Sequence, residues 1–222
     1  MAATVALGGQ VVNAVSNLLI GGATVSACDG ADAACAAPLA VGTTDASMDP
    51  GVTMVVPTPG PAGFEGYFRT TGANLVPTDH YYNPFSKTYL SLRLRTVSPA
   101  EVQTAAAISG VVVDPSRGQL IVEATHCPDA FVPAPFGGPA PGVTLTADTA
   151  DAATAVVYTD GQNFPDPSLT QTTNLGGAVI FNVPPGAVLI TMTVVADGSV
   201  AAVFPANVKA GELAHLTISP TP

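Results

Sequence analysis

The segment from residue 172 to residue 186 constrains the fold more than any other part of the chain. A polar stretch, 172–176, is typical of a turn, and the apolar stretch 177–183 that follows alternates with the period of a β-strand. Two sets of side chains fall on opposite faces: Ala178, Ile180 and Asn182 on one, and Val179, Phe181 and Val183 on the other. Because Pro184-Pro185-Gly186 closes the segment, we expect a short strand that stops at a sharp corner.

A related layout occurs early in the chain, where the apolar segment 22–27 is followed by the polar segment 42–45. The chain has 222 residues, enough for two domains of about 100 residues each. Its 22 glycines and 21 prolines interrupt apolar runs, as they do in all-β folds rich in turns. Asp197-Gly198 between two apolar runs predicts a tight hairpin, and segment 169–173 also reads as a strand. The pattern therefore predicts two small β-sandwich modules in series.

One helix is predicted between the two modules. Ser98-Pro99-Ala100-Glu101 is a capping box with proline at the first helical position, and Gly110 supplies a C-terminal stop. A helix of about 10 residues is too short to be stable alone, so it must pack on one module or sit between the two. We interpret 98–110 as a linking helix, with sandwich domains at 1–97 and 111–222.

The charge balance excludes several classes of function. Six basic and 16 acidic residues give a net charge of −10, which disfavours binding to nucleic acids and to anionic membrane surfaces. No run of 18 apolar residues is present, so we expect no transmembrane helix. Only 10% of residues are charged, well below the ~25% that is usual for soluble proteins. Hydrophobic residues make up 47% of the chain, which argues against intrinsic disorder.

The three cysteines bear on the compartment. Cys28 and Cys35 flank a short polar loop that joins two expected strand ends, so we predict a disulfide between them and an oxidising compartment. The alternative is three buried free thiols in a cytosolic protein. Cys127 would stay unpaired and buried. The N-terminus has no signal-peptide pattern, and we expect either a cytosolic protein or, preferably, a secreted one whose signal peptide an initiator methionine has replaced.

Both halves resemble the carboxypeptidase regulatory-like, or transthyretin-like, β-sandwich family. The resemblance is carried by these segments: Gly9-Gln10-Val11-Val12-Asn13, Gly22-Ala23-Thr24-Val25, Pro141-Gly142-Val143-Thr144-Leu145, and 172–186. The pattern departs from the family at Asn174, where Asp is usual, and at 44–48, which lacks a glycine. The resemblance implies an all-β chain of two Greek-key, transthyretin-like or Ig-like sandwiches, such as secreted bacterial proteins contain. It marks a fold better than a function, because such modules occur on peptidases, transporters and adhesins.

A dense aromatic segment is the first candidate binding site. His80, Tyr81, Tyr82 and Phe85 lie within six residues, and exposed aromatic side chains could stack on a sugar or anchor a protein partner. The alternative is that alternate members of the segment fill the sandwich core.

A polar loop is the second candidate. Asp160, Asn163 and Asp166 offer oxygen ligands of the kind that Ca²⁺ prefers, although no carboxylate closes the loop. The alternative is turn chemistry, because Asp and Asn side chains bond to their own backbone in turns. We expect no other cofactor.

Catalytic signatures are missing from the sequence. His80, His126 and His215 are far apart along the chain and match no metal motif, and there is no nucleophile elbow. We therefore expect no enzyme but a secreted or cell-surface binding or adhesion module whose partner is a protein or a glycan. The first alternative is a self-associating subunit of an extracellular fibre or surface layer; the second is a metal-dependent enzyme that gathers the three histidines by folding.

Overall fold

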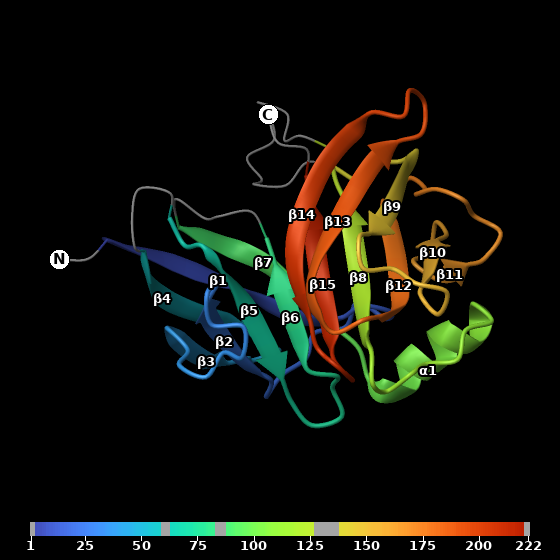
Figure 1. Ribbon diagram of the computed structural model, residues 1–222. Helices are drawn as coiled ribbons and strands as arrows, with labels where there is room; N and C mark the ends of the chain where they lie inside the picture. The colour runs from blue at the N-terminus through green and yellow to red at the C-terminus, as the bar shows by residue number, and fades with distance from the viewer. Residues whose placement is uncertain (1–2, 59–62, 83–87, 127–137, 220–222) are drawn as a thin grey trace. The chain divides into compact units, whose positions relative to one another are not determined.

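The computed structural model describes residues 3–58, 63–82, 88–126 and 138–219, and it divides into two compact units, Met1–Pro99 and Ala100–Pro222. Fifteen strands and one helix account for the regular structure of these residues (Figure 1). The fold class is therefore all-β with a single helix, as the sequence predicts.

The first unit contains two sheets. A three-stranded sheet has the order β4-β1-β7, and a second sheet has the order β3-β2-β5-β6. The strands are β1 (Ala3–Asn13), β2 (Thr24–Asp29), β3 (Ala40–Thr43), β4 (Val52–Thr58), β5 (Gly66–Thr71), β6 (Thr78–Tyr81) and β7 (Tyr89–Thr96). All neighbours run antiparallel except β1 and β7, which are parallel.

Alternation along the strands builds the core of this unit. On β4, Val52, Met54 and Val56 are buried, whereas the residues between them are exposed. A strand places successive side chains on opposite faces, so this period of two gives the sheet one apolar and one solvent-facing side. Gly9 is required where β1 passes β7, because a Cβ atom there would overlap Leu92.

The second unit also contains two sheets. One has the order β11-β10-β12-β8-β15 and the other β14-β13-β9. The elements are α1 (Pro99–Ile108), β8 (Gly118–Ala124), β9 (Val143–Ala147), β10 (Ala155–Thr159), β11 (Pro165–Asp166), β12 (Gly177–Val183), β13 (Gly186–Val194), β14 (Val200–Val208) and β15 (Leu213–Ile218). Here β8 and β15 form the parallel pair.

The two units repeat one strand order. In the first unit the fourth strand, the first and the last are neighbours (β4-β1-β7), and in the second unit the matching strands are neighbours too (β12-β8-β15). The second, fifth and sixth strands also match, as β2-β5-β6 and β9-β13-β14. Two strands differ: β3 pairs with β2, whereas β10 pairs with β12 and so belongs to the other sheet, and the two-residue strand β11 beside β10 has no counterpart among the described strands of the first unit. This repeat pairs β12 with β4, whereas the early segment 22–27, which resembles 172–186 in layout, forms β2, so the two related layouts do not occupy matching places in the two units.

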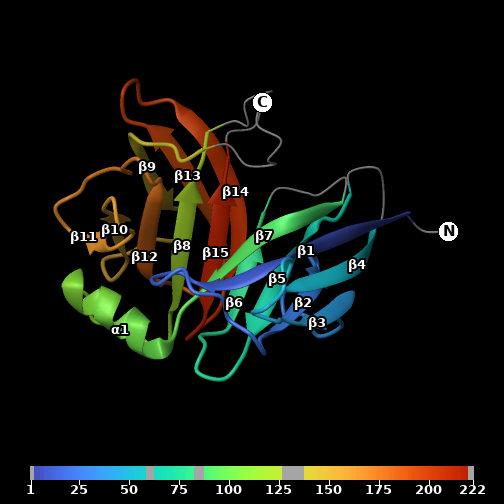
Figure 2. The same cartoon turned by 180° about the vertical axis from the view of Figure 1, so that it is seen from behind.

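The helix belongs to the second unit. Ala106 of α1 packs in a cluster with Val157 of β10 and Phe181 of β12, and both views place α1 beside these strands (Figures 1 and 2). Gly110, with φ of 68°, ends the helix as its sequence predicts. Because its buried face contacts β10 and β12, the helix serves as part of that unit's core.

The structure tests two further predictions about local structure, a hairpin at Asp197-Gly198 and a strand at 169–173. The Asp197-Gly198 hairpin forms between β13 and β14, with φ of 72° at Gly198. The strand expected at 169–173 is wrong, because this stretch is a loop in which the Thr172 hydroxyl donates to the Ala140 carbonyl at 2.7 Å. The sheets are consistent with β-sandwich architecture; the count of two Greek-key sandwiches and the domain bounds 1–97, 98–110 and 111–222 stay predictions.

A polar hub at Asn182 joins two loops of the second unit to β12, the loop between α1 and β8 and the loop between β9 and β10. Its amide donates to the Val112 and Ala153 carbonyls at 2.8 and 3.4 Å, and its Oδ1 accepts from the Asp114 N–H at 2.9 Å. Arg117 donates to the Asn182 carbonyl at 3.0 Å and forms a two-pronged pair with Asp151. Asn182 adopts φ of 56° at an irregularity in β12, which turns its side chain to these loops.

Candidate functional site

The disulfide predicted between Cys28 and Cys35 is present, with Cα atoms 5.2 Å apart. It closes an exposed loop at the end of β2. Inside this loop the Asp32 carbonyl accepts from the Cys35 N–H at 3.0 Å and from the Tyr67 hydroxyl at 2.8 Å. The loop is thus held both by the covalent bridge and by a hydrogen bond to β5.

Tyr67 and Tyr81 stack beside this loop, with ring centroids 5.3 Å apart. They face each other across β5 and β6, and Cys28 is the partner of Tyr67 on β2. Burial raises the pKa of Tyr67 to about 12, and the negative charges of Asp79 and Asp32 add to the shift. The Tyr67 hydroxyl is therefore a hydrogen-bond donor at neutral pH and is unsuited to act as a base.

An ion pair lies next to the tyrosine stack. Arg69 donates to Asp79 at 2.8 Å across the same two strands. The Asp79 side chain is only 3% exposed and that of Arg69 19% exposed, so the two charges balance each other in place. The pair has the geometry of a structural contact that fixes the register of β5 and β6.

The predicted aromatic binding segment is mostly buried. His80 on β6 is fully buried, and its Nε2 lies 3.0 Å from the Thr70 hydroxyl oxygen. Tyr82 is 8% exposed and donates to the Arg93 carbonyl at 2.9 Å. Tyr81 is half-buried, and Phe85 lies outside the described residues. His80 and Tyr82 thus have little surface to offer a sugar or a partner, in line with the alternative that they fill the core.

The predicted calcium ligands occupy a turn. Asp160 Oδ1 accepts from the N–H groups of Gln162 and Phe164 at 2.8 and 3.0 Å, and Asn163 has φ of 65°. Asp166 Oδ1 accepts from both the N–H and the hydroxyl of Ser168. These bonds use the oxygens in the way that turn chemistry requires, and the calcium site stays a prediction.

A turn held by an aspartate side chain occurs at four places where a serine stands two residues after an aspartate. In each, the aspartate Oδ1 accepts the serine N–H at 2.8–2.9 Å and its hydroxyl at 2.6–2.7 Å. The hydroxyl bond lowers the pKa of each carboxyl: Asp45, Asp114, Asp166 and Asp197. The Asp-x-Ser spacing is readable in the sequence and is a turn signal that was not among the predicted features. Part of the chain's acidity therefore serves to form turns.

The three histidines lie in different surroundings. His80 lies in the first unit; His126 and His215 lie in the second, where His126 is exposed and His215 is buried with Nε2 3.4 Å from Glu123 Oε2. Over the described part of the chain, no group of three His, Cys, Asp or Glu residues could hold a metal ion. Cys127 lies outside the described residues.

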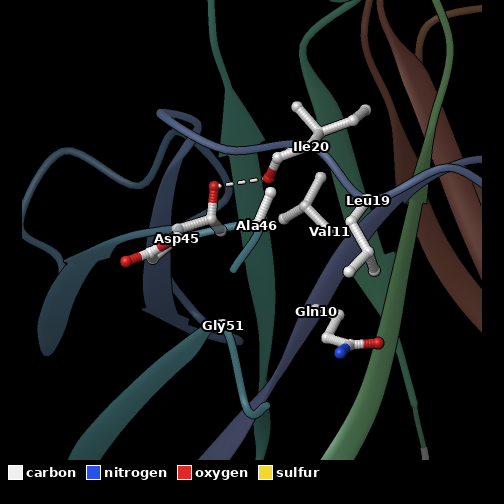
Figure 3. A pocket seen from close by; sticks show the side chains of 8 residues that line it. Gln10, Val11, Leu19, Ile20, Asp45, Ala46 and Gly51 are labelled. Carbon is white, nitrogen blue, oxygen red and sulfur yellow. Dashed lines mark hydrogen bonds between the residues drawn. The ribbon is translucent and has the colours of Figure 1, made fainter. Parts of the chain in front are cut away.

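A shallow recess occurs at one end of the first unit (Figure 3). It leaves no room for a water molecule, whereas pockets for small molecules usually measure ~300–1,000 Å³. The Thr44 hydroxyl donates to the Ile20 carbonyl at 2.7 Å across it, and Ser47 engages the Asp45 carboxylate. The residues that line it are Gln10, Val11, Leu19, Ile20, Thr44, Asp45, Ala46 and Gly51. The recess is too small for a typical cofactor or substrate.

Comparisons with known proteins give no family for this chain. No family model and no curated protein matches it. Among solved structures it is similar to the TIE protein of Bacillus anthracis, at 13% identity over 98% of this chain and 34% of that chain, with a TM-score of 0.30. It is also similar to the shaft pilin SpaA of Lactobacillus rhamnosus GG (12% identity, 100% and 99% coverage, TM-score 0.29) and to GBS52, the minor pilin of Streptococcus agalactiae (12%, 99% and 97%, 0.28).

These similarities carry no argument about family or function, because every TM-score quoted is at or below 0.30. The chain spans about a third of the length of the TIE protein that it matches. The resemblance to the carboxypeptidase regulatory-like family accordingly stays a prediction, based on the segments quoted from the sequence.

Proposed function

We propose that this protein is a non-catalytic module of a bacterial secreted or cell-surface protein, which works by binding or by assembly. The observation that carries the proposal is the Cys28–Cys35 disulfide, since structural disulfides persist mainly in oxidising compartments. The Tyr67 hydroxyl bond to Asp32 supports a structural role for this bridge, because it ties the closed loop to the sheet.

The use of the polar side chains supports a role without catalysis. His80 bonds to Thr70 in the core, and Asp114 and Asp166 hold turns. A catalytic acid or base has to reach the proton that it transfers in a site open to a substrate, and these groups are engaged elsewhere.

Over the described residues, no helix is long and apolar enough to cross a membrane.

Binding and fibre assembly make different use of the sheet edges. Two edge strands carry a proline, Pro57 on β4 and Pro205 on β14, and proline on an edge strand discourages pairing with another chain. These edges thus do not favour a fibre built by adding strand to strand. A protein or glycan partner, or assembly through sheet faces, remains the proposed mode of action.

Labelling of intact cells tests the proposed location. Antibody binding and protease treatment of unbroken source cells should detect and cleave the protein, with a cytosolic enzyme as the uncleaved control. Detection only after lysis would refute a surface role, and a culture-supernatant assay covers the secreted form.

Electron microscopy of the purified protein separates binding from fibre formation. Filaments or sheets would favour the structural subunit, whereas discrete particles would favour the binding module. Particles that bind neither glycan arrays nor surface-protein fractions would contradict the binding module.

A further inference from the structure

The short strand β3 forms an open edge of the first unit. It lies at the end of its sheet, beside β2 (Figures 1 and 2). The Thr44 N–H donates to the Ala23 carbonyl at 2.9 Å, and hydrogen-bonded positions alternate along an antiparallel pair. Gly42 therefore bonds to β2, whereas the N–H and C=O groups of Val41 and Thr43 point away from it. Among the described residues, no group donates to them or accepts from them.

Other edge strands of the protein carry blocking groups. On β9 the Leu145 N–H donates to the Tyr158 hydroxyl at 3.1 Å, and on β7 the Arg93 carbonyl accepts from the Tyr82 hydroxyl at 2.9 Å. Three further edge strands, β4, β11 and β14, each carry a proline, which discourages pairing: Pro57, Pro165 and Pro205. The strand β3 has neither device, and Val41 is 58% exposed. Its edge is therefore open to a partner.

The strand β3 is held in place at both ends. The Cys28–Cys35 disulfide closes the loop that leads into it. At its other end, the Thr44 hydroxyl donates to the Ile20 carbonyl at 2.7 Å and accepts from the Ala23 N–H at 3.0 Å. A strand that is already fixed in its paired geometry loses little conformational entropy when a partner binds.

The surroundings of β3 are acidic. No Lys, Arg or His precedes Arg69 in the sequence, and Arg69 is itself paired with Asp79 at 2.8 Å. Carboxylates lie shortly before and shortly after β3 in the chain, at Asp29, Asp32, Asp45 and Asp49. The edge therefore lies in a negative field that attracts positively charged segments.

We propose that the β3 edge binds an extended, positively charged segment of another protein, which pairs with Val41 and Thr43 as an added strand. This rests on the proposed function, of which it specifies the partner. The outward N–H and C=O groups require an occupant with a row of amide groups of its own. The acidic residues on either side favour Lys or Arg next to the paired residues. Because β3 is short, the contact consists of few main-chain bonds and is weak.

The charges disfavour a second copy of this chain at the same edge. Whichever way two β3 edges pair, the acidic loops of one copy lie beside the acidic loops of the other, and like charges that face each other destabilise strand pairing. Nucleic acids are repelled for the same reason. A glycan offers no extended row of amide groups to pair with the strand.

NMR titration of the purified, isotope-labelled full chain with a synthetic peptide tests the proposal. The probe is Lys-Val-Thr-Val-Thr-Lys, blocked at both ends. It should bind with a Kd below about 1 mM, shift the amide signals of Val41 and Thr43 most, and bind more weakly as NaCl is added. The same peptide with every central amide N-methylated keeps its charge but has no N–H to pair, so it should bind at least about 10-fold more weakly. A peptide with Glu in place of Lys should also bind more weakly.

Variants of the protein locate the site. Val41→Pro removes an N–H that has no partner within the described fold, and it should weaken binding about 10-fold or more. Its matched control is Val41→Thr, which keeps the N–H and the branched side chain and should bind like wild type. Asp49→Asn should weaken binding about 3-fold by removing one nearby charge, whereas Asp197→Asn, in the second unit, should have no effect.

Four results would overturn the proposal: no binding of the Lys peptide up to about 1 mM, equal binding of the N-methylated peptide, full binding by Val41→Pro, or the largest shifts away from β3. A dimer of the peptide-free protein that Val41→Pro abolishes in sedimentation would also overturn it, because the edge would then belong to a second copy. Melting temperatures show whether the variants are folded, and the N-methylated peptide tests the pairing on the wild type itself. Failure here leaves the cell-surface location untouched, because the labelling of intact cells tests it separately.

Discussion

Replacing Asn182 should show how strongly a single polar side chain holds the second unit together. Its side chain makes three hydrogen bonds, to the Asp114 N–H and to the carbonyls of Val112 and Ala153, and it is 4% exposed. A hydrogen bond contributes about 1 kcal/mol net to folding. Val112 is 87% exposed, so water replaces its partner at little cost. We therefore expect Asn182→Gly to lower the free energy of unfolding by about 2 kcal/mol.

Asn182→Ala should cost more than Asn182→Gly. The backbone at Asn182 has φ of 56°, where alanine suffers a steric penalty of roughly 1 kcal/mol that glycine avoids. We expect a loss of about 3 kcal/mol for alanine, seen as a fall of about 10 °C in the melting temperature of the second unit. Calorimetry and urea unfolding followed by circular dichroism measure both variants.

The control for backbone strain is Asn74→Ala. Asn74 is exposed with φ of 58°, so it should lose only the steric share of about 1 kcal/mol. The reasoning is refuted if Asn182→Ala equals Asn182→Gly, or if neither differs from wild type.

Three further predictions concern acid, the disulfide and Tyr67. In the folded protein the pKa of the Asp151 carboxyl falls to about 2, and the pKa is lowered at four further carboxyls: Asp45, Asp114, Asp166 and Asp197. Because these pKa values lie below the unfolded value of about 3.9, the carboxyls stabilise the fold only while they are ionised. The melting temperature should therefore stay constant above pH 4 and fall toward pH 2, and a flat profile would contradict this. Replacing both Cys28 and Cys35 by serine should cost about 2.5 kcal/mol from the loop entropy of a short ring, measured by urea unfolding; an unchanged midpoint would contradict it. Absorbance titration should show one tyrosine ionising near pH 12, lost in Tyr67→Phe.

The strands that line the core could be predicted from the sequence, because a period of two is a local signal. Gly177–Val183 forms where alternation places it, and Asp197-Gly198 marks its hairpin. The parallel pairing of β1 with β7 and of β8 with β15 could not be predicted. Those partners are distant in sequence, and no local pattern specifies a non-local pair.

The candidate sites were harder to predict than the fold. Adjacent aromatic residues signal either a binding surface or a core, and only burial distinguishes them: Tyr82 is 8% exposed whereas Tyr81 is half-buried. The asparagine of the strand 177–183 was assigned only to a face, because its role depends on φ of 56° at an irregularity in β12. The disulfide was predictable, since Cys28 and Cys35 lie close in sequence on either side of a turn.

The redox state of Cys28 and Cys35 in the source cells tests the central claim most directly. Thiols are blocked with a maleimide at the moment of lysis, and the peptide that contains both cysteines is then weighed by mass spectrometry before and after reduction. An extracellular module with a structural bridge predicts no label until a reductant is added. Full labelling without reductant would place both thiols in a reducing compartment and contradict the account.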